Sequence, residues 1–369
     1  MSKLVELLKQ GQSVWLDYID RDLVEQGGLG ELVGLGVRGV TSNPSIFQKA
    51  ITGSNAYDDT VRNVLQADPQ ASAETLYELL TLQDVQSAAD ILRGVYDSSK
   101  GNDGYVSHEV SPHLAHDTQG TIDAARHLWR EVHRPNLMIK VPATPEGLPA
   151  IEQLIGEGIN VNVTLLFSVA RYEEVFHAWL RGLAANPEPG HIASVASFFV
   201  SRVDNMVDPA LEAIGSDTAL VLRGKTAIAN AAIAWLRFAE LAQSREFIAQ
   251  RERGARVQRL LWGSTSTKNP AYADTLYVDE LIGPDTVNTL PPNTLDAFQQ
   301  HGTVRRTIDQ DPHAAAQQLK ALAKLGIDLG SVTQRLEDEG VAKFAADYDV
   351  LLLALRKKVE ESAKEYAAS

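Results

Sequence analysis

One lysine stands inside an apolar run, where lysine is an unusual residue. Lys140 lies within LMIKVPA, residues 137–143. Lysine is almost never fully buried unless it is paired, since burial strips the water that solvates its ammonium group. Desolvation favours the neutral amine, which can attack a carbonyl carbon and form a Schiff base. The sequence therefore makes Lys140 a candidate nucleophile; the alternative is a structural lysine paired with a carboxylate.

Two carboxylates occupy similar apolar runs. Asp17 lies in VWLDYI, residues 14–19, and Glu109 lies in VSHEV, residues 106–110. Acids among apolar neighbours can act as general acids or bases because their surroundings tune their proton affinity. A structural ion pair with Lys140 is the alternative for each acid alone. All three together favour chemistry, because each carries a burial cost.

Further polar residues in the apolar runs could bind a ligand. Asn162 and Thr164 alternate along NVNVT, residues 160–164, so they project from the same face of a strand. An amide and a hydroxyl there suit a polyhydroxylated ligand, or form a polar layer whose members satisfy one another. Asn43 opens a helix in TSNPS, residues 41–45, where Asn before Pro is equally an ordinary helix cap.

Ser197, Arg202 and Lys268 lie at or just beyond the ends of two later strands. Barrel proteins often bind phosphate in the loops after their last strands. An arginine fork and a lysine would supply positive charge there, although each cation alone could be an ordinary surface residue.

The elements that carry these residues alternate short apolar runs with amphipathic segments. The expected strands are residues 13–19, 37–42, 105–110, 136–143, 159–167, 191–200, 258–266 and 275–281. The expected helices between them include residues 75–96, 117–131, 145–157 and 170–184. Continuous apolar runs are typical of parallel strands covered by helices on both faces. About eight such units predict a (β/α)8 TIM barrel with additional helices. A doubly wound open sheet remains the alternative, since a strand count does not prove closure.

The chain is longer than a minimal barrel of roughly 250 residues. Helical insertions are expected at about residues 45–100 and 217–253, with a helical C-terminal extension at about residues 291–369. A length of 369 residues would suit two domains. Because no low-complexity linker divides the chain, we predict a single barrel domain over residues 1–369.

Composition excludes several classes of protein. A net charge of −14 argues against nucleic acid as a partner. The absence of cysteine excludes disulfides, thiolate metal sites and cysteine nucleophiles. With no signal peptide and no apolar run of roughly 18 to 20 residues, we expect a soluble, cytoplasmic protein without a membrane partner.

The sequence predicts neither a cofactor nor a metal. No dinucleotide-binding glycine motif, phosphate-binding loop or zinc-protease motif is present. Three histidines follow or flank Glu109 in the sequence and could be metal ligands: His108, His113 and His116. A loop of solvated histidines is the preferred interpretation.

Two segments resemble the transaldolase family. VTSNPS, residues 40–45, resembles its TSNPS/TTNPS signature. Residues 137–168, LMIKVPATPEGLPAIEQLIGEGINVNVTLLFS, are similar to its active-lysine motif and the strand that follows. Residues 195–202 and 260–269 match later strands more loosely, and WGSTSTKNP looks like the longer bacterial and plant-type subgroup. The resemblance spans nearly the whole chain in the right order.

The resemblance implies an activity and a role for each residue. A dihydroxyacetone unit would pass from sedoheptulose 7-phosphate to glyceraldehyde 3-phosphate, giving erythrose 4-phosphate and fructose 6-phosphate in the non-oxidative pentose phosphate pathway. Lys140 would form the Schiff base, Asp17 would take the C4 hydroxyl proton, and Glu109 would act through a water held by Thr164. The sugar hydroxyls would be bound by Asn43, Asn162 and Ser197, and the phosphate by Arg202 and Lys268. The protonated imine is the electron sink, so this chemistry uses no metal.

The resemblance also separates two enzymes. Transaldolases resemble one another in an aromatic that cannot donate a hydrogen bond where Phe199 stands, whereas related aldolases that release free dihydroxyacetone carry tyrosine. Such an aldolase is one alternative function, and a non-catalytic barrel that binds sugar phosphates is another. The sequence does not predict the oligomeric state; a homodimer is one possible assembly.

Overall fold

Eight parallel strands form a closed barrel in chain order. The computed structural model describes residues 2–368, so the two end residues of the predicted domain 1–369 lie outside it. The strands are β1 (Gln12–Leu16), β2 (Val37–Thr41), β3 (Tyr105–Glu109), β4 (Leu137–Pro142), β5 (Val161–Leu166), β6 (Ser194–Phe199), β7 (Arg259–Gly263) and β8 (Thr286–Leu290). β1 pairs in parallel with β8, beginning at Gln12 opposite Thr286. This closure confirms the predicted (β/α)8 barrel and excludes the open sheet.

The strands are apolar because helices cover the outside of the barrel. Every residue of β4 and β5 is buried. The helices that follow the third, fourth and fifth strands are α7 (Thr118–Val132), α8 (Gly147–Gly156) and α9 (Val169–Ala185), each within a few residues of its expected range. The remaining elements of the barrel wall and its connections are α1 (Lys3–Lys9), α2 (Arg21–Glu25), α3 (Gly28–Leu35), α10 (Ser201–Ile214) and the short 3-10 turns η1 (Pro112–Leu114) and η2 (Pro189–His191).

The eighth strand was predicted in the wrong place. Residues 275–281 contain helix α14 (Leu276–Asp279), and the strand follows as β8. The buried side chains of this segment include Tyr277, Val278 and Leu281, a one-sided spacing that suits a helical turn better than strict alternation. The true strand, TVNTL, was overlooked because three of its five residues are polar. Those side chains are nevertheless buried; Asn288, for example, accepts a hydrogen bond from Thr265.

The three segments outside the minimal barrel are largely helical. Residues 45–100 contain most of α4 (Pro44–Gly53), together with α5 (Asp58–Ala67) and α6 (Ala73–Ser98). Residues 217–253 contain α11 (Asp217–Leu220), α12 (Thr226–Leu241) and α13 (Arg245–Glu252). After β8 come α15 (Pro292–His301), α16 (Pro312–Lys324) and α17 (Leu329–Ala368).

None of the helices within residues 2–368 combines the length and apolar character needed to cross a bilayer.

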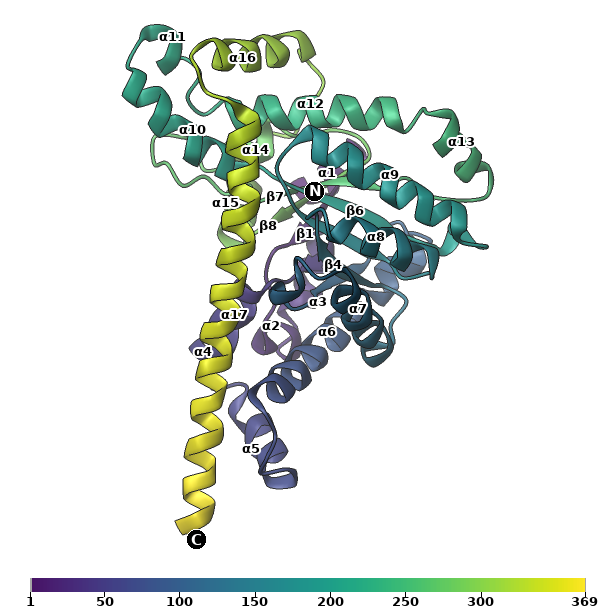
Figure 1. Cartoon of the computed structure of the whole chain (residues 1–369), viewed down its shortest axis with the longest axis vertical. Coiled ribbons are helices and arrows are strands. Elements are labelled where there is room, and N and C mark those ends of the chain that lie inside the picture. Colours follow the sequence, from purple (N-terminus) through teal and green to yellow (C-terminus); the bar gives the residue numbers. More distant parts are fainter. Residues whose placement is uncertain (1, 369) are drawn as a thin grey trace.

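Helix α17 is the element that the barrel plan does not explain. Figure 1 shows it in yellow as one long helix along the side of the molecule, passing α4. It contacts α4, α6, α10 and strand β5. Its buried side chains Phe344, Leu351 and Leu355 belong to the same apolar cluster as the outer faces of the strands. The C-terminal helix is therefore packed onto the barrel and forms part of its wall.

Candidate active site

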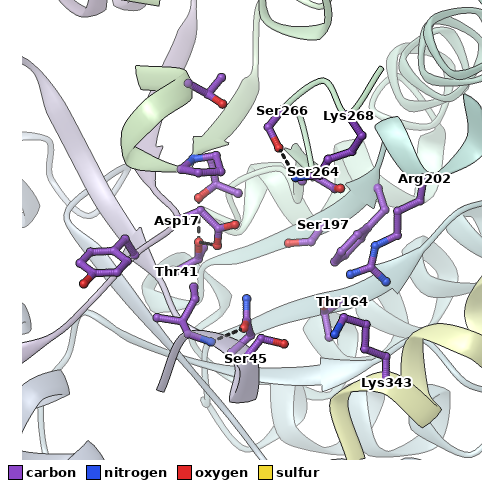
Figure 2. Close-up of a pocket in the computed structure, with 18 of the residues that line it drawn as sticks. Asp17, Thr41, Ser45, Thr164, Ser197, Arg202, Ser264, Ser266, Lys268 and Lys343 are labelled. Carbon is purple, nitrogen blue, oxygen red and sulfur yellow. Dashed lines mark hydrogen bonds between the residues drawn. The ribbon is translucent and has the colours of Figure 1, made fainter. Parts of the chain in front are cut away.

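A cavity of about 1330 Å³ opens at the carboxyl ends of the strands. Side chains from or after seven of the eight strands line it, and Figure 2 shows several of them facing a shared space. The predicted site residues among them are Asp17, Asn43, Lys140, Thr164, Ser197, Arg202 and Lys268. The other two, Glu109 and Asn162, lie directly behind this lining. The fold thus brings together residues that are spread over more than half of the chain.

Lys140 both lines the cavity and pairs with a carboxylate. Its side chain is 5% exposed, and its Nζ donates a hydrogen bond to the carbonyl oxygen of Ser42 at 3.0 Å. Nζ lies 3.5 Å from Oε2 of Glu109. The strand register explains the contact, since Glu109 of β3 is the direct neighbour of Lys140 in β4. A buried amine at a cavity wall, next to a carboxyl group, can attack a carbonyl and exchange protons with that group.

Glu109 and Thr164 present buried oxygen atoms without hydrogen-bond partners in the described part of the chain. These are both carboxyl oxygens of Glu109 and Oγ1 of Thr164. Burial raises the pKa of Glu109, while Lys140 opposes the shift. Glu109 keeps its ion pair with Lys140, but buried polar atoms in folded proteins nearly always make hydrogen bonds as well, so these oxygens are available to a partner from the cavity. Substrate or water oxygens fit both positions.

Asp17 follows directly after β1 and is held by one hydroxyl. Its Oδ1 accepts a hydrogen bond from Oγ1 of Thr41 at 2.7 Å, and Thr41 also lies 2.7 Å from the hydroxyl of Thr289 (Figure 2). Burial raises the pKa of Asp17, with Lys140, Thr41 and Arg202 acting in the opposite direction. A carboxyl group with raised proton affinity in a cavity is suited to take a proton from a substrate hydroxyl and return it.

The amide residues of the site are largely engaged within the protein. Asn162 accepts from the Ser197 hydroxyl at 2.6 Å and donates to the Ser107 hydroxyl at 2.9 Å. For Asn162 this is the polar layer that the sequence left open as an alternative, but the Thr164 hydroxyl takes no part in it. Asn43 is the N-cap of α4, because its Oδ1 accepts from the backbone N–H of Ile46 at 2.9 Å. Since Asn43 also lines the cavity, capping and ligand contact are compatible there.

The two predicted phosphate-binding cations differ in their surroundings. Arg202, in the first turn of α10, makes no hydrogen bond or salt bridge with the described side chains, those of residues 2–360, and burial lowers its pKa. Lys268 is exposed in the loop after β7, with its Nζ 3.1 Å from the hydroxyl of Ser266. Arg202 is thus a partly buried cation that feels the charges of Asp17 and Asp347 but makes no salt bridge, so its N–H groups can bind an anion.

Several lining residues were not predicted from the sequence. Basic side chains outnumber acidic ones in the cavity: Lys49, Lys140, Arg202, Lys268, Arg335 and Lys343 against Asp17, Asp274 and Glu339. Lys343 comes from α17 and pairs with Asp347 at 3.0 Å. Arg335 of the same helix pairs with Glu339 at 2.7 Å. Pairs spaced four residues apart look like ordinary surface pairs, so only the packing of α17 could reveal their position.

The three histidines near Glu109 do not converge. His108 is buried, with its ring 5.8 Å from that of Phe47, and burial lowers its pKa to about 4. His113 and His116 pair instead with Asp349 and Glu146 at 2.7 and 3.1 Å. The expectation of a solvated loop is therefore wrong for His108, which lies on the outer side of β3 against α4. Among the side chains of residues 2–360, which the structure describes, no group of three or more potential ligands is arranged to hold a metal ion.

Comparison with known proteins identifies the family. The family model described as "Transaldolase/Fructose-6-phosphate aldolase" matches residues 14–355. A transaldolase of Thiobacillus denitrificans is 47% identical over 94% of this chain and 98% of its own length. Transaldolases of Mycolicibacterium smegmatis and Acidothermus cellulolyticus are 48% and 49% identical, each over 98% of both chains. The chain therefore belongs to the transaldolase/fructose-6-phosphate aldolase family.

Proposed function

We propose that this protein is a transaldolase that transfers a dihydroxyacetone unit between sugar phosphates through a Schiff base on Lys140. The donor is sedoheptulose 7-phosphate and the acceptor glyceraldehyde 3-phosphate, giving erythrose 4-phosphate and fructose 6-phosphate. The observation that carries the proposal is the buried Lys140 amine at the cavity wall, 3.5 Å from Glu109. The membership of the chain in the family supports it.

Schiff-base formation needs one nucleophile and one proton relay. The Lys140 amine attacks the C2 carbonyl of the donor, and the resulting carbinolamine loses water to give the iminium. Glu109 supplies the proton that leaves with the hydroxyl, because burial raises its pKa and it lies beside Lys140. A water held by Thr164 relays this proton from Glu109, since the buried Thr164 hydroxyl has no hydrogen-bond partner among the described side chains.

Carbon–carbon cleavage needs a base at the C4 hydroxyl. Asp17 takes that proton, the C3–C4 bond breaks, and the electron pair moves to the iminium nitrogen. The products are an enamine on Lys140 and a free aldehyde. In the second half of the reaction the enamine attacks the acceptor aldehyde, Asp17 returns the proton to the new hydroxyl, and hydrolysis releases Lys140. The Thr41 hydroxyl fixes the orientation of the Asp17 carboxylate through their hydrogen bond of 2.7 Å.

The remaining residues anchor the substrate. Arg202 and Lys268 bind the phosphate, which explains a basic cavity in a protein of net charge −14. Asn43 and Ser197 contact sugar hydroxyls from the cavity wall. Asn162 lies behind Ser197 and orients its hydroxyl through their hydrogen bond of 2.6 Å.

The experiment is borohydride reduction in the presence of fructose 6-phosphate, followed by peptide mass mapping. Borohydride reduces the imine to a stable secondary amine, so a three-carbon adduct is expected on Lys140 alone. Lys49, Lys268 and Lys343, which also line the cavity, are internal controls. An adduct on any lysine other than Lys140, or the absence of an adduct, would overturn the proposal.

A related aldolase that releases free dihydroxyacetone is the second candidate. Phe199 argues against it, because the phenyl ring lines the cavity without a hydroxyl that could activate water for release of the three-carbon unit. An enzymatic assay for free dihydroxyacetone, run without acceptor aldehyde, separates the two functions. Accumulation over many turnovers would favour the aldolase.

We also propose one domain, a cytoplasmic location and a homodimer. The single domain is supported by the shared apolar cluster, which extends from Leu4 to Leu355. Cooperative unfolding in one transition, subcellular fractionation and light scattering test these three proposals in turn.

A further inference from the structure

The guanidinium group of Arg202 lies close to two phenyl rings from distant parts of the chain. Its central carbon is 5.2 Å from the ring centre of Phe199 in β6 and 5.9 Å from that of Phe344 in α17. Both rings are buried, and Phe344 is only 3% exposed. Both distances are within the range of cation–π attraction.

These rings hold the arginine without occupying its hydrogen-bond donors. Among the side chains that the structure describes, those of residues 2–360, Arg202 has no hydrogen-bond or salt-bridge partner, so its N–H groups remain available to a ligand. A long side chain that is free in solution loses rotamer freedom when it binds an anion, which weakens binding. Contact with two buried rings restricts that freedom before the ligand arrives.

The sequence of α17 allows the helix to approach this closely. Gly340 lies one turn before Phe344, and a Cβ atom at that position would be 2.9 Å from Cδ2 of Leu165 and 3.7 Å from a terminal nitrogen of Arg202. Leu165 lies in the irregular part of β5, at a positive φ of 61°, directly after Thr164. Glycine therefore lets α17 pack against the strand end that forms one side of the cavity.

A second contact attaches α17 to helix α4. The Ser45 hydroxyl donates to Asp347, which also accepts from Lys343 at 3.0 Å. Ser45 lies in the first turn of α4, two residues after Asn43. The helix is thus attached both near Arg202 and near Asn43, and Phe344 lies between these attachments.

We propose that Phe344 is a positioning residue that sets the Arg202 guanidinium for the phosphate group of the substrate. This inference rests on the proposed function, because it takes Arg202 as a phosphate-binding residue. Phe344 itself touches the arginine and not the reacting atoms. Its loss should weaken binding of phosphorylated ligands and leave the chemical steps on Lys140 intact.

The test compares Phe344→Leu, which removes the ring and keeps an apolar side chain, with Phe344→Tyr, which keeps a ring. For Phe344→Leu we expect KM for fructose 6-phosphate to rise by about two- to fivefold, the effect of losing one cation–π contact, with kcat unchanged. Phe344→Tyr should retain most of the wild-type KM. Transfer from unphosphorylated fructose should not respond to either change. Leu353→Ala, at an exposed position of the same helix, is the matched control and should resemble wild type.

A double-mutant cycle with Arg202→Ala shows whether Phe344 acts through the arginine. If it does, Phe344→Leu has no further effect on KM once Arg202 is gone. An equal effect with and without Arg202, or a parallel loss of activity with fructose, would mean a merely structural role and overturn the inference.

Calorimetric titration with inorganic phosphate separates this inference from the proposed function, since it needs no turnover. Weaker phosphate binding by Phe344→Leu, absent in the Arg202→Ala background, would support the positioning role even if the wild-type protein transferred no sugar. An unchanged Kd for phosphate in Phe344→Leu would refute it even if the wild-type protein proved to be an active transaldolase.

Discussion

Replacing Lys140 by methionine tests whether the buried lysine is a nucleophile, a structural cation or both. Methionine fills a similar volume and has no amine, so sugar transfer and borohydride trapping should both disappear. The change also leaves Glu109 without its cation. At 3.5 Å and an effective dielectric constant of about 20, the lost attraction is about 5 kcal/mol. Measured losses on removing one partner of a buried pair are about 3–5 kcal/mol.

The size of this loss should depend on pH. Burial raises the pKa of Glu109, and without Lys140, which now lowers it, the folded-state pKa should rise further. A carboxyl group whose pKa is higher in the folded state than in the unfolded state stabilises the fold at low pH, and that contribution disappears as the pH rises through the folded pKa. Lys140→Met should therefore be close to wild type in stability near pH 5 and clearly less stable near pH 8.

Urea unfolding at both pH values, followed by circular dichroism, measures the effect. Lys140→Met combined with Glu109→Gln is the control, because it removes both charges and should recover most of the stability at pH 8. A trapped adduct in Lys140→Met would refute the catalytic assignment. If the double variant lost as much stability as the two single changes together, the pairing argument would fail.

Three further predictions follow from the buried groups. Thr164→Val should leave the urea midpoint unchanged, because no described side chain loses a hydrogen bond. The value of kcat should nevertheless fall at least roughly tenfold. An unchanged kcat would show that Thr164 takes no part in the mechanism. Phe199→Tyr should increase the rate of free dihydroxyacetone release without acceptor, and an unaltered rate would show that this position does not separate the two activities. Burial raises the pKa of Asp204 to about 7, so its stabilising contribution is present below its unfolded value near 4 and is lost as the pH rises through 7. As the pH rises from 5 to 8, Asp204→Asn should therefore gain about 2–3 kcal/mol of stability relative to wild type, and a constant difference in unfolding free energy across that range would refute this.

The positions of the candidate catalytic residues could be predicted because the topology of a parallel barrel largely determines where the end of each strand lies. Parallel strands in a barrel all end at the same face, so a polar residue near the end of an apolar run is expected at that face of the barrel. Lys140 and Asp17 follow from that rule alone. Contact between Glu109 and Lys140 follows from the register of neighbouring strands. No comparable rule gives the hydrogen bonds of Asn162, which depend on side-chain orientation.

The misplaced eighth strand has a different cause. Apolar content was the signal used for every strand, and β8 is more polar than the helical segment before it. Its Thr286 and Asn288 are buried because they accept hydrogen bonds from Gln12 and Thr265. A polar side chain inside a barrel can find a partner on a neighbouring strand or loop, so the composition of a single strand understates its burial.

Helix α17 marks the limit of what sequence patterns can assign to a site. Its residues Arg335, Glu339 and Lys343 recur every four positions, which places them on one face of a helix but does not say what that face covers. Gly340 is a more specific signal of a close contact. Glycine inside a helix costs about 1 kcal/mol of stability relative to alanine, so its presence there suggests that a larger side chain would not fit. Here the contacts are Leu165 and Arg202. Gly340→Ala would therefore act on Arg202, the proposed phosphate-binding residue, through packing alone, and a rise in KM for fructose 6-phosphate with kcat unchanged would identify that route. A variant with wild-type KM would mean that Leu165 moves aside and that the approach of α17 is not what orients Arg202.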